Sequence, residues 1–420
     1  MLNFFLCGIV FLFYSFVKFK RDKIFYPSVV FSFMWGGVCM YTAAILSGYG
    51  KDLYLKNYYV FHVMDTYIIY FTIAMLLGFI LAHCCKKSRY SINLMMDLDF
   101  INKILSNYKW IMWLNFFGGV LRIIIMVSTV GIDNMMDYRA AANAMMMTSS
   151  FTFAGIVFKL TAYVQMLANF YVGLYGLKTG FDSLKLKKTI VIFLLYAPTQ
   201  MATGGRLFIL YFILFFFGAF LLGRGFALRS QSRNLLEQSE KKVLILSFAV
   251  LLSLVGIIAM VRGIGIRQDK ETTLEKFAYI TEGMLATEYL MNYYPKGTFQ
   301  LDYGENTSGN LSQKYLKFRR HLRSTKMSSV VVCIFTPLYL DFGYWGSLIV
   351  LFILAFVLEL FALKSLNKMG LINFFIYMII LKILYESVMA QSISENLPNY
   401  ELILLFVIFY KRLFGRFEVG

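Results

Sequence analysis

The sequence is poor in the residues and motifs that several classes of enzyme require. Only 5 Cys and 3 His occur among 420 residues. The cysteines show no paired spacing, so neither a disulfide framework nor a zinc site is indicated. The chain also lacks a Walker motif, a His pair on one helix face, a Gly-x-Ser-x-Gly elbow and an Asp-x-Asp pair. These absences argue against ATP hydrolysis, metal-dependent hydrolysis and redox chemistry, and we expect no metal and no cofactor.

Acidic residues are also scarce, since 23 Asp and Glu stand against 41 Lys and Arg and leave a net charge of +18. Such a charge can indicate binding to nucleic acid. However, 59% of the residues are hydrophobic, well above the usual share in soluble domains. Abundant Phe (43) and Tyr (29) with only 5 Pro suit long apolar helices that carry aromatic rings at the membrane interfaces. We therefore expect an all-α integral membrane protein without a nucleic-acid partner.

Eleven apolar segments are long enough, or nearly so, to cross a bilayer. The first lacks a basic leader and a small-residue cleavage site, so it is expected to remain as a helix. The segments cover about residues 2–17, 24–47, 63–84, 110–130, 153–176, 189–203, 207–223, 243–261, 344–363, 371–388 and 400–410.

The distribution of cations predicts the topology. Connections after the odd-numbered segments hold 23 Lys and Arg, whereas the short connections after the even-numbered segments hold four. Because positive loops stay in the cytoplasm, the N-terminus is predicted to be periplasmic and the C-terminus cytoplasmic, in a bacterial inner membrane. Residues 330–340, which contain Pro337, are interpreted as a re-entrant segment, since a further full span would place the basic C-terminal tail outside.

A long connection predicted to be external separates two groups of spans. The chain thus divides into residues 1–261 with eight spans, a periplasmic loop at 262–329, and residues 330–420 with the re-entrant segment and three spans. The loop is expected to contain an amphipathic helix in 271–293 and a basic one in 314–326, where Leu311, Tyr315, Phe318 and Leu322 recur at helical spacing. It is expected to pack on the membrane bundle rather than fold alone.

Ionisable groups inside spans are costly and are therefore functional candidates. Arg122, Lys159, Lys382 and Glu386 qualify, and all four lie in the predicted outer halves of their helices. We expect Arg122, Lys159 and Lys382 to line an outward-facing cavity. The alternative is that Lys382 and Glu386 neutralise each other one helical turn apart, while Lys159 extends to the interface.

Cations on the predicted external side suggest a site for a strongly anionic membrane substrate such as a lipid diphosphate. Arginine binds phosphate with two parallel hydrogen bonds and stays charged in an apolar site. The candidates are Arg139, Arg206, Arg262, Arg267, Arg319, Arg320 and Arg323; singly, each could instead anchor lipid headgroups. Candidate bases are His321 and the loop carboxylates Asp269, Glu282, Glu288 and Asp302, and their spacing does not choose among them.

Two short motifs and the order of elements resemble Wzy-type O-antigen polymerases. The first is the Thr203-Gly204-Gly205-Arg206 turn that opens the Phe-rich and Leu-rich segment ending at Phe220. The second is Asp341-Phe342-Gly343-Tyr344-Trp345-Gly346, which enters a span directly after the large external loop.

The resemblance implies a GT-C-like plan and metal-independent glycosyl transfer. Its donor would be a growing glycan on undecaprenyl diphosphate and its acceptor one lipid-linked repeat unit. The arginines would then hold the donor diphosphate, and His321 or a loop carboxylate such as Asp269 or Glu282 would accept the proton of the acceptor hydroxyl. Membrane lipids and a chain-length regulator are the other partners that it implies.

Other classes of membrane protein share parts of this pattern. A flippase for lipid-linked sugars also needs cationic cavities, but such transporters usually have an even helix count, short loops and internal repeats, which are not seen here. An O-antigen ligase shares the large external loop. A membrane acyltransferase shares it too, but no His lies in the outer half of a predicted span.

Overall fold

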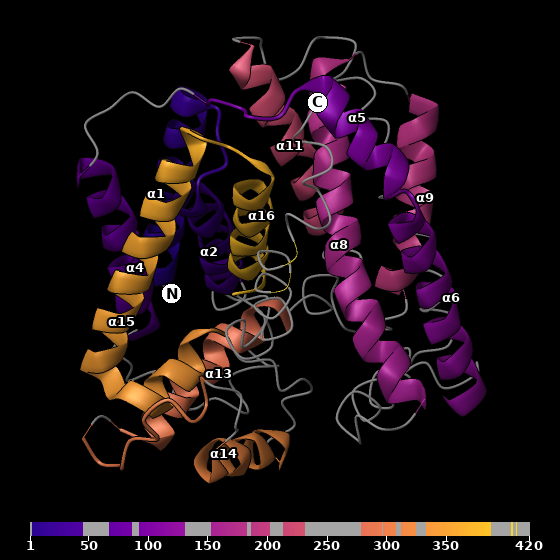
Figure 1. Cartoon of the computed structure of the whole chain (residues 1–420). Helices are drawn as coiled ribbons and strands as arrows, with labels where there is room; N and C mark the ends of the chain where they lie inside the picture. The colour runs from indigo at the N-terminus through magenta and orange to yellow at the C-terminus, as the bar shows by residue number, and fades with distance from the viewer. Residues whose placement is uncertain are drawn as a thin grey trace. The chain divides into compact units, whose positions relative to one another are not determined.

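The computed structural model describes residues 2–44, 67–85, 92–130, 153–182, 186–201, 213–231, 279–295, 297–307, 312–324, 333–387, 405 and 409. These residues are mostly helical and contain no β-strand, which confirms the predicted α class (Figure 1). The helices are α1 (Leu2–Asp22), α2 (Pro27–Ala44), α4 (Tyr67–Cys85), α5 (Leu98–Asn107), α6 (Trp110–Val130), α8 (Phe153–Phe181), α9 (Leu186–Met201), η3 (Ile213–Phe217), α11 (Gly218–Ser230), α13 (Tyr279–Tyr293), α14 (Gln313–Ser324), α15 (Phe335–Leu366) and α16 (Leu371–Glu386).

Several of these helices suit a lipid bilayer. Among the described residues, four are long and apolar enough to cross one: Leu2–Asp22, Ile68–Cys85, Phe153–Phe181 and Phe335–Leu366. Shorter apolar helices cover Trp110–Ile125, Lys188–Thr199 and Leu371–Tyr385. The chain is therefore a helical membrane protein, while the count of eleven spans stays a prediction.

Contacts group the chain into two compact units, each built from segments far apart in the sequence. Unit 1 comprises Met1–Tyr90, Asp269–Leu366 and Ile379–Leu397. Unit 2 comprises Ser91–Gln268, Asn367–Met378 and Pro398–Gly420.

In unit 1, α15 packs along α4, and α1 packs along α2 (Figure 1). The backbones of α4 and α15 approach closely at Gly78, where a Cβ atom would collide with the carbonyl of Phe352. An aromatic core joins the helices, with the ring of Trp35 centred 4.7 Å from that of Phe335. The indole N–H of Trp35 donates to Oγ of Ser387 at 3.0 Å, so this polar group is satisfied inside an apolar core.

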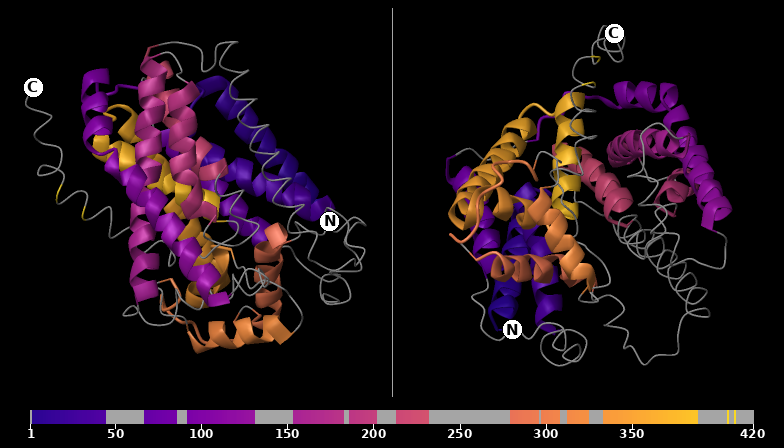
Figure 2. Two further views of the ribbon diagram at one scale, coloured as in Figure 1. Left: turned by 90° about the vertical axis from the view of Figure 1, so that its right-hand side faces the viewer. Right: turned by 90° about the horizontal axis from the view of Figure 1, so that it is seen from below.

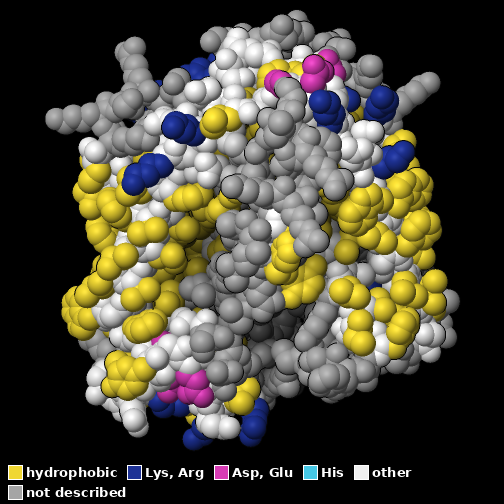
Figure 3. Space-filling model, in the orientation of Figure 1, with side chains coloured by type: hydrophobic (Ala, Val, Ile, Leu, Met, Phe, Trp, Pro, Cys, Tyr) yellow, Lys and Arg dark blue, Asp and Glu magenta, His cyan; other side chains and the backbone are white. Residues whose placement is uncertain are grey.

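The exposed side of α15 is apolar. Trp345, Ile349, Ile353 and Val357 recur every fourth residue and are all more than half exposed. Figure 3 shows hydrophobic side chains along α4 and α15, with Lys and Arg gathered towards the ends of the helices. This pattern is typical of a surface that lipid solvates.

Unit 2 is held by close contact of helices at small residues. The backbone of α8 meets that of α11 at Gly176 and Gly223, where any side chain would collide with the facing carbonyl. Between these helices the buried guanidinium of Arg224 donates to the carbonyl of Thr179 at 2.8 Å. In α9, Pro198 removes a backbone donor, and Asn115 of α6 donates to the nearby carbonyl of Leu195 at 3.0 Å.

Two helices of unit 1, α13 and α14, belong to the segment predicted as the large loop. Figure 2 shows them as neighbours that run in different directions, and α13 packs against α2, α4 and α15. The carboxylate of Glu288, on α13, is buried and accepts the N–H of Ile68 at 2.6 Å. This N–H has no partner within α4 because it lies in the first turn of the helix, so Glu288 caps α4.

Candidate functional site

The α13–α14 segment, residues 279–324, carries several of the predicted site residues. Its helix α14 begins after Ser312, whose Oγ accepts the N–H of Tyr315 at 3.2 Å as an N-cap. Tyr315 and Phe318 are buried, whereas Lys317 and Arg320 are exposed. Tyr315 and Phe318 therefore pack within the protein, and Lys317 and Arg320 point outward. Figure 3 shows Lys and Arg side chains at the lower edge of unit 1.

His321 lies in an aromatic setting that α13 provides. The hydroxyl of Tyr289 lies 2.8 Å from Nε2 of His321, and the two rings are nearly parallel at 7°. The ring of Tyr293 is centred 5.0 Å from the imidazole. Burial, with a smaller effect from Tyr293, raises the pKa of the Tyr289 phenol, so this hydroxyl keeps its proton at neutral pH. These contacts fix the plane of the imidazole.

A tight turn between the helices is fastened to α15 by Asp341, whose side chain is fully buried. The Asp341 carboxylate accepts the N–H of Asn306 at 3.0 Å, the side-chain amide of Asn306 at 2.8 Å and the N–H of Thr307 at 2.7 Å. A carboxylate that loses water is stabilised by such donors. Two residues later α15 is interrupted at Gly343, which adopts φ +67°. The Asp-Phe-Gly sequence thus joins the turn to the start of the long apolar part of α15.

An ion pair links the same turn to α14. Nζ of Lys314 lies 2.6 Å from Oδ1 of Asp302, and the amide of Asn306 donates to the other oxygen at 3.0 Å. Burial opposes ionisation of Asp302, but hydrogen bonds from Lys314, Ser312 and Asn306 outweigh it and hold the pKa of Asp302 below its ordinary value. Asp302 is therefore a charged structural group and a poor proton acceptor.

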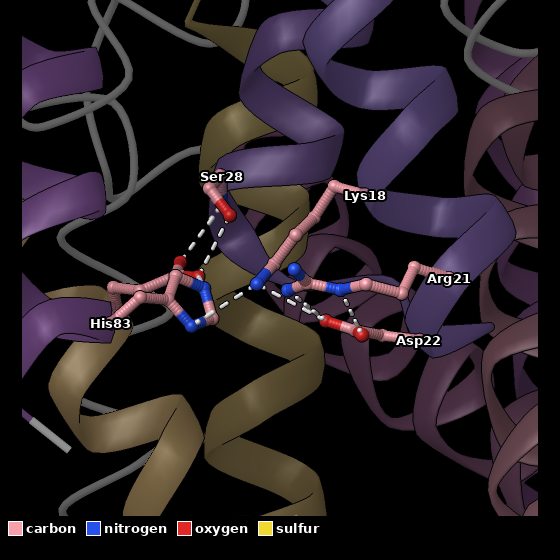
Figure 4. Close-up of polar contacts among 6 residues, drawn as sticks. Lys18, Arg21, Asp22, Ser28 and His83 are labelled. Carbon is pink, nitrogen blue, oxygen red and sulfur yellow. Dashed lines mark hydrogen bonds and ion pairs between the residues drawn. The ribbon is translucent and has the colours of Figure 1, made fainter. Parts of the chain in front are cut away.

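A second polar cluster of unit 1 lies where α1, α4 and α15 end and α2 begins. We refer to Lys18, Asp22, Ser28, His83 and Glu359 as the His83 network (Figure 4). Nε2 of His83 lies 2.6 Å from Oε1 of Glu359, and Nζ of Lys18 lies 3.3 Å from Nδ1 of His83. Lys18 is also paired with Asp22 at 3.1 Å.

The chemistry of these partners determines the tautomer of His83. An ammonium group has no lone pair to accept with, so Nδ1 of His83 must accept from Lys18. Nε2 then carries the proton and donates to Glu359. Glu359 also accepts the hydroxyl of Ser28 at 2.7 Å and the N–H of Ser28 at 2.9 Å, which lies in the first turn of α2. The fully buried carboxylate thus accepts three hydrogen bonds, two from Ser28 and one from His83.

Glu359 is missing from the ionisable residues picked out in the sequence, although it lies within the predicted span 344–363. A lone carboxylate in such a run is itself a signal of a polar partner. The partners could not be inferred, because His83 is 276 positions away and Ser28 is 331 positions away.

Among the predicted site residues, six have described side chains, two of which are Glu288 and Asp302, given above. His321 and Arg320 lie on α14, as given above. Arg122, on α6, is buried, and its guanidinium carbon lies 4.3 Å from the centre of the Phe158 ring. This contact compensates part of the cost of a buried cation. Lys382, on α16, is partly buried.

For the other predicted site residues, the structure describes no side chain. Lys159, Glu282, Arg319 and Arg323 lie on α8, α13 and α14, but their side chains are outside the described set. Entirely outside the described residues are Arg139, Arg206, Arg262, Arg267 and Asp269, together with the Thr203–Arg206 turn.

Comparison of the chain with protein-family models, curated proteins and solved structures gave no match. Functional assignments for this membrane protein therefore rest on its own residues.

Proposed function

We propose that this chain is a membrane glycosyltransferase that joins oligosaccharide repeat units, carried on undecaprenyl diphosphate, into O-antigen or a similar surface polysaccharide. In this proposal the α13–α14 segment faces the periplasm, the chain lies in a bacterial inner membrane, and the N-terminus is periplasmic while the C-terminus is cytoplasmic. No metal takes part, and cations stabilise the leaving diphosphate.

The observation that carries the proposal is the arrangement of α14. Its apolar residues Tyr315 and Phe318 are buried in the protein, so the helix does not need lipid to cover them. Its exposed cations, Lys317 and Arg320, remain available to an anionic ligand. One residue after Arg320 comes His321, held by Tyr289 at 2.8 Å. The proposed phosphate-binding group, Arg320, and the proposed proton acceptor, His321, are thus consecutive residues of one helix.

The proposed reaction uses these groups in defined roles. The acceptor hydroxyl attacks the anomeric carbon of the donor glycan, and the bond from that carbon to the diphosphate oxygen breaks. His321 takes the hydroxyl proton, while the electron pair leaves with the diphosphate, whose growing charge Arg320 and the other predicted arginines stabilise. Asp302 and Glu288 are excluded as bases in this scheme, because the first is held as an anion by Lys314 and the second caps α4.

The test is complementation of a strain from which the gene has been deleted. Surface lipopolysaccharide is separated on a gel after expression of the wild-type chain, His321→Ala, Arg320→Gln, Arg206→Ala or Arg262→Ala. Lys364→Gln, which removes an exposed cation at the other end of α15, is the matched control. Immunoblots of membranes verify equal insertion.

We expect deletion of the gene to remove the ladder of long lipopolysaccharide chains from the gel, while one repeat unit remains on the core. The site variants should fail to restore the ladder, and Lys364→Gln should restore it. Loss of every repeat unit from the core would favour a flippase or a ligase instead. Normal ladders from both Arg206→Ala and Arg262→Ala would contradict the diphosphate site.

A further inference from the structure

Tyr303 has an unusual backbone for a large residue. It adopts φ +48° and is followed by Gly304 at φ +94°, and the N–H of Glu305 donates to the carbonyl of Asp302 at 3.1 Å. Two successive positive φ angles in a four-residue turn closed by this hydrogen bond are typical of a type I′ turn, where Gly, Asn and Asp dominate the central positions. Glycine at the second position fits this preference. Tyrosine at the first does not, because its Cβ crowds the backbone there.

The surroundings hold this conformation in place. The N–H of Tyr303 donates to the carbonyl of Asp341, and the N–H of Asp302 donates to the carbonyl of Leu340, both at 3.1 Å. Asp341 fastens the following residues through its buried carboxylate, and Lys314 fastens Asp302. A strained residue persists only where the neighbouring structure determines its conformation in this way, and such residues are frequent at ligand sites.

The side chain that results is strongly exposed. Tyr303 is 76% exposed, the highest value among the large apolar side chains that the structure describes. Its ring makes no hydrogen bond and no ring contact with another described residue. Packing against the described residues of unit 1 therefore does not explain why a tyrosine, rather than the favoured Asn or Gly, occupies this position.

We infer that Tyr303 is a ligand-contact residue that stacks its ring on the apolar C–H face of a sugar in the glycan substrate. This inference rests on the proposed function for the class of ligand. A phenol ring offers a flat apolar face and a polar tip, which match the two kinds of surface on a sugar. The exposed carboxylate of Glu305, two residues on, can accept hydrogen bonds from sugar hydroxyls.

The alternative to a sugar ligand is the bilayer interface, where exposed tyrosines are also common. The turn favours the sugar. The same turn carries the exposed carboxylate of Glu305, a group that an anionic lipid surface does not favour. An interfacial anchor also needs only an exposed ring, which ordinary backbone supplies, whereas stacking on one sugar requires a fixed direction.

The test uses the full-length protein in nanodiscs and a fluorescently labelled repeat-unit oligosaccharide, released from the surface polysaccharide of the strain that carries the gene. Tyr303→Gly and Tyr303→Asn remove the ring and suit the turn, while Tyr303→Phe keeps the ring. Tyr70→Ala removes another exposed tyrosine, on α4, as the control. Anisotropy gives the dissociation constant, and thermal unfolding gives the stability of each variant.

We expect Tyr303→Gly and Tyr303→Asn to bind the oligosaccharide about tenfold more weakly or worse, as for loss of an aromatic anchor. Their unfolding temperatures should equal or exceed that of the wild-type chain, since strain is relieved. Tyr303→Phe and Tyr70→Ala should bind like the wild type. Loss of binding together with a lowered unfolding temperature would show a structural role and overturn the inference.

Two further outcomes separate the possibilities. If the wild-type chain binds the oligosaccharide and Tyr303→Gly binds it equally well, only the role of Tyr303 fails. If the wild-type chain does not bind it at all, the proposed function fails with it. In Tyr303→Trp, extra fluorescence quenched by brominated lipids but unchanged by the oligosaccharide would place the ring in the bilayer and overturn the inference.

Discussion

Nε2 of His83 and Oε1 of Glu359 lie 2.6 Å apart and join the end of α4 to α15. The pair is enclosed by Lys18 and Ser28, so that every group of the His83 network faces a group of complementary hydrogen-bonding character (Figure 4). Such a network sets the register of the helices that it connects, because a shift of either helix would leave buried polar groups without their partners.

Removal of the Glu359 charge should destabilise unit 1. Glu359→Leu leaves His83, Ser28 and the first turn of α2 without their acceptor, and breaking a buried pair of this kind costs about 3–5 kcal/mol. We expect a clear fall in the unfolding temperature of the purified protein, measured by intrinsic fluorescence. The exposed Glu305→Leu is the matched control and should unfold like the wild type. Equal stability of Glu359→Leu would show that the network contributes nothing.

His83 should exist as the Nε2–H tautomer. The prediction follows from Lys18, which can donate to Nδ1 but cannot accept from it. Long-range ¹⁵N–¹H correlation spectra of His-labelled protein distinguish the two ring nitrogens, and His83→Gln identifies the signal. In Lys18→Met the preference for this tautomer should weaken. A proton on Nδ1 in the wild-type protein would contradict the Lys18–His83 hydrogen bond.

Asp341→Asn should loosen the turn that precedes α14. An amide presents only one acceptor oxygen, so at least one of the three donors from Asn306 and Thr307 loses its partner, at a cost of about 1–3 kcal/mol. Trypsin should then cleave more rapidly after Lys317 and Arg320 on α14, as mapped by mass spectrometry. Asp99→Asn, on α5 of unit 2, serves as the control. Unchanged cleavage in Asp341→Asn would exclude the fastening role.

The Asp302–Lys314 pair should make the turn sensitive to acid. Because the folded state holds the pKa of Asp302 below its ordinary value, the charged form stabilises folding above that ordinary value, and this stabilisation is lost as the pH falls through the lowered one. Hydrogen exchange of residues 302–307 should therefore accelerate, after correction for intrinsic rates, as the pH falls below about 4. In Asp302→Asn this additional acid dependence should disappear, and its persistence would assign the effect to another carboxylate.

The sequence by itself determined the class of protein. A long apolar run is stable in lipid chiefly as a helix, because backbone N–H and C=O groups that have no water must form hydrogen bonds within their own segment. The cationic character of α14 and its stripe of Tyr315 and Phe318 are local periodic features, so they too could be read before the structure. The eleven spans, their orientation and the polymerase assignment stay predictions.

Only the tertiary structure decided which polar residues meet. Glu359 was not recognised from its apolar surroundings, and Glu288 could not be distinguished from other candidate bases until its bond to Ile68 was known. The conformation of Tyr303 likewise depends on Asp341, 38 positions later, and on Lys314. Local periodicity reports which side of a helix is apolar, but it carries no information on partners, because those contacts join segments that only the packed core brings together.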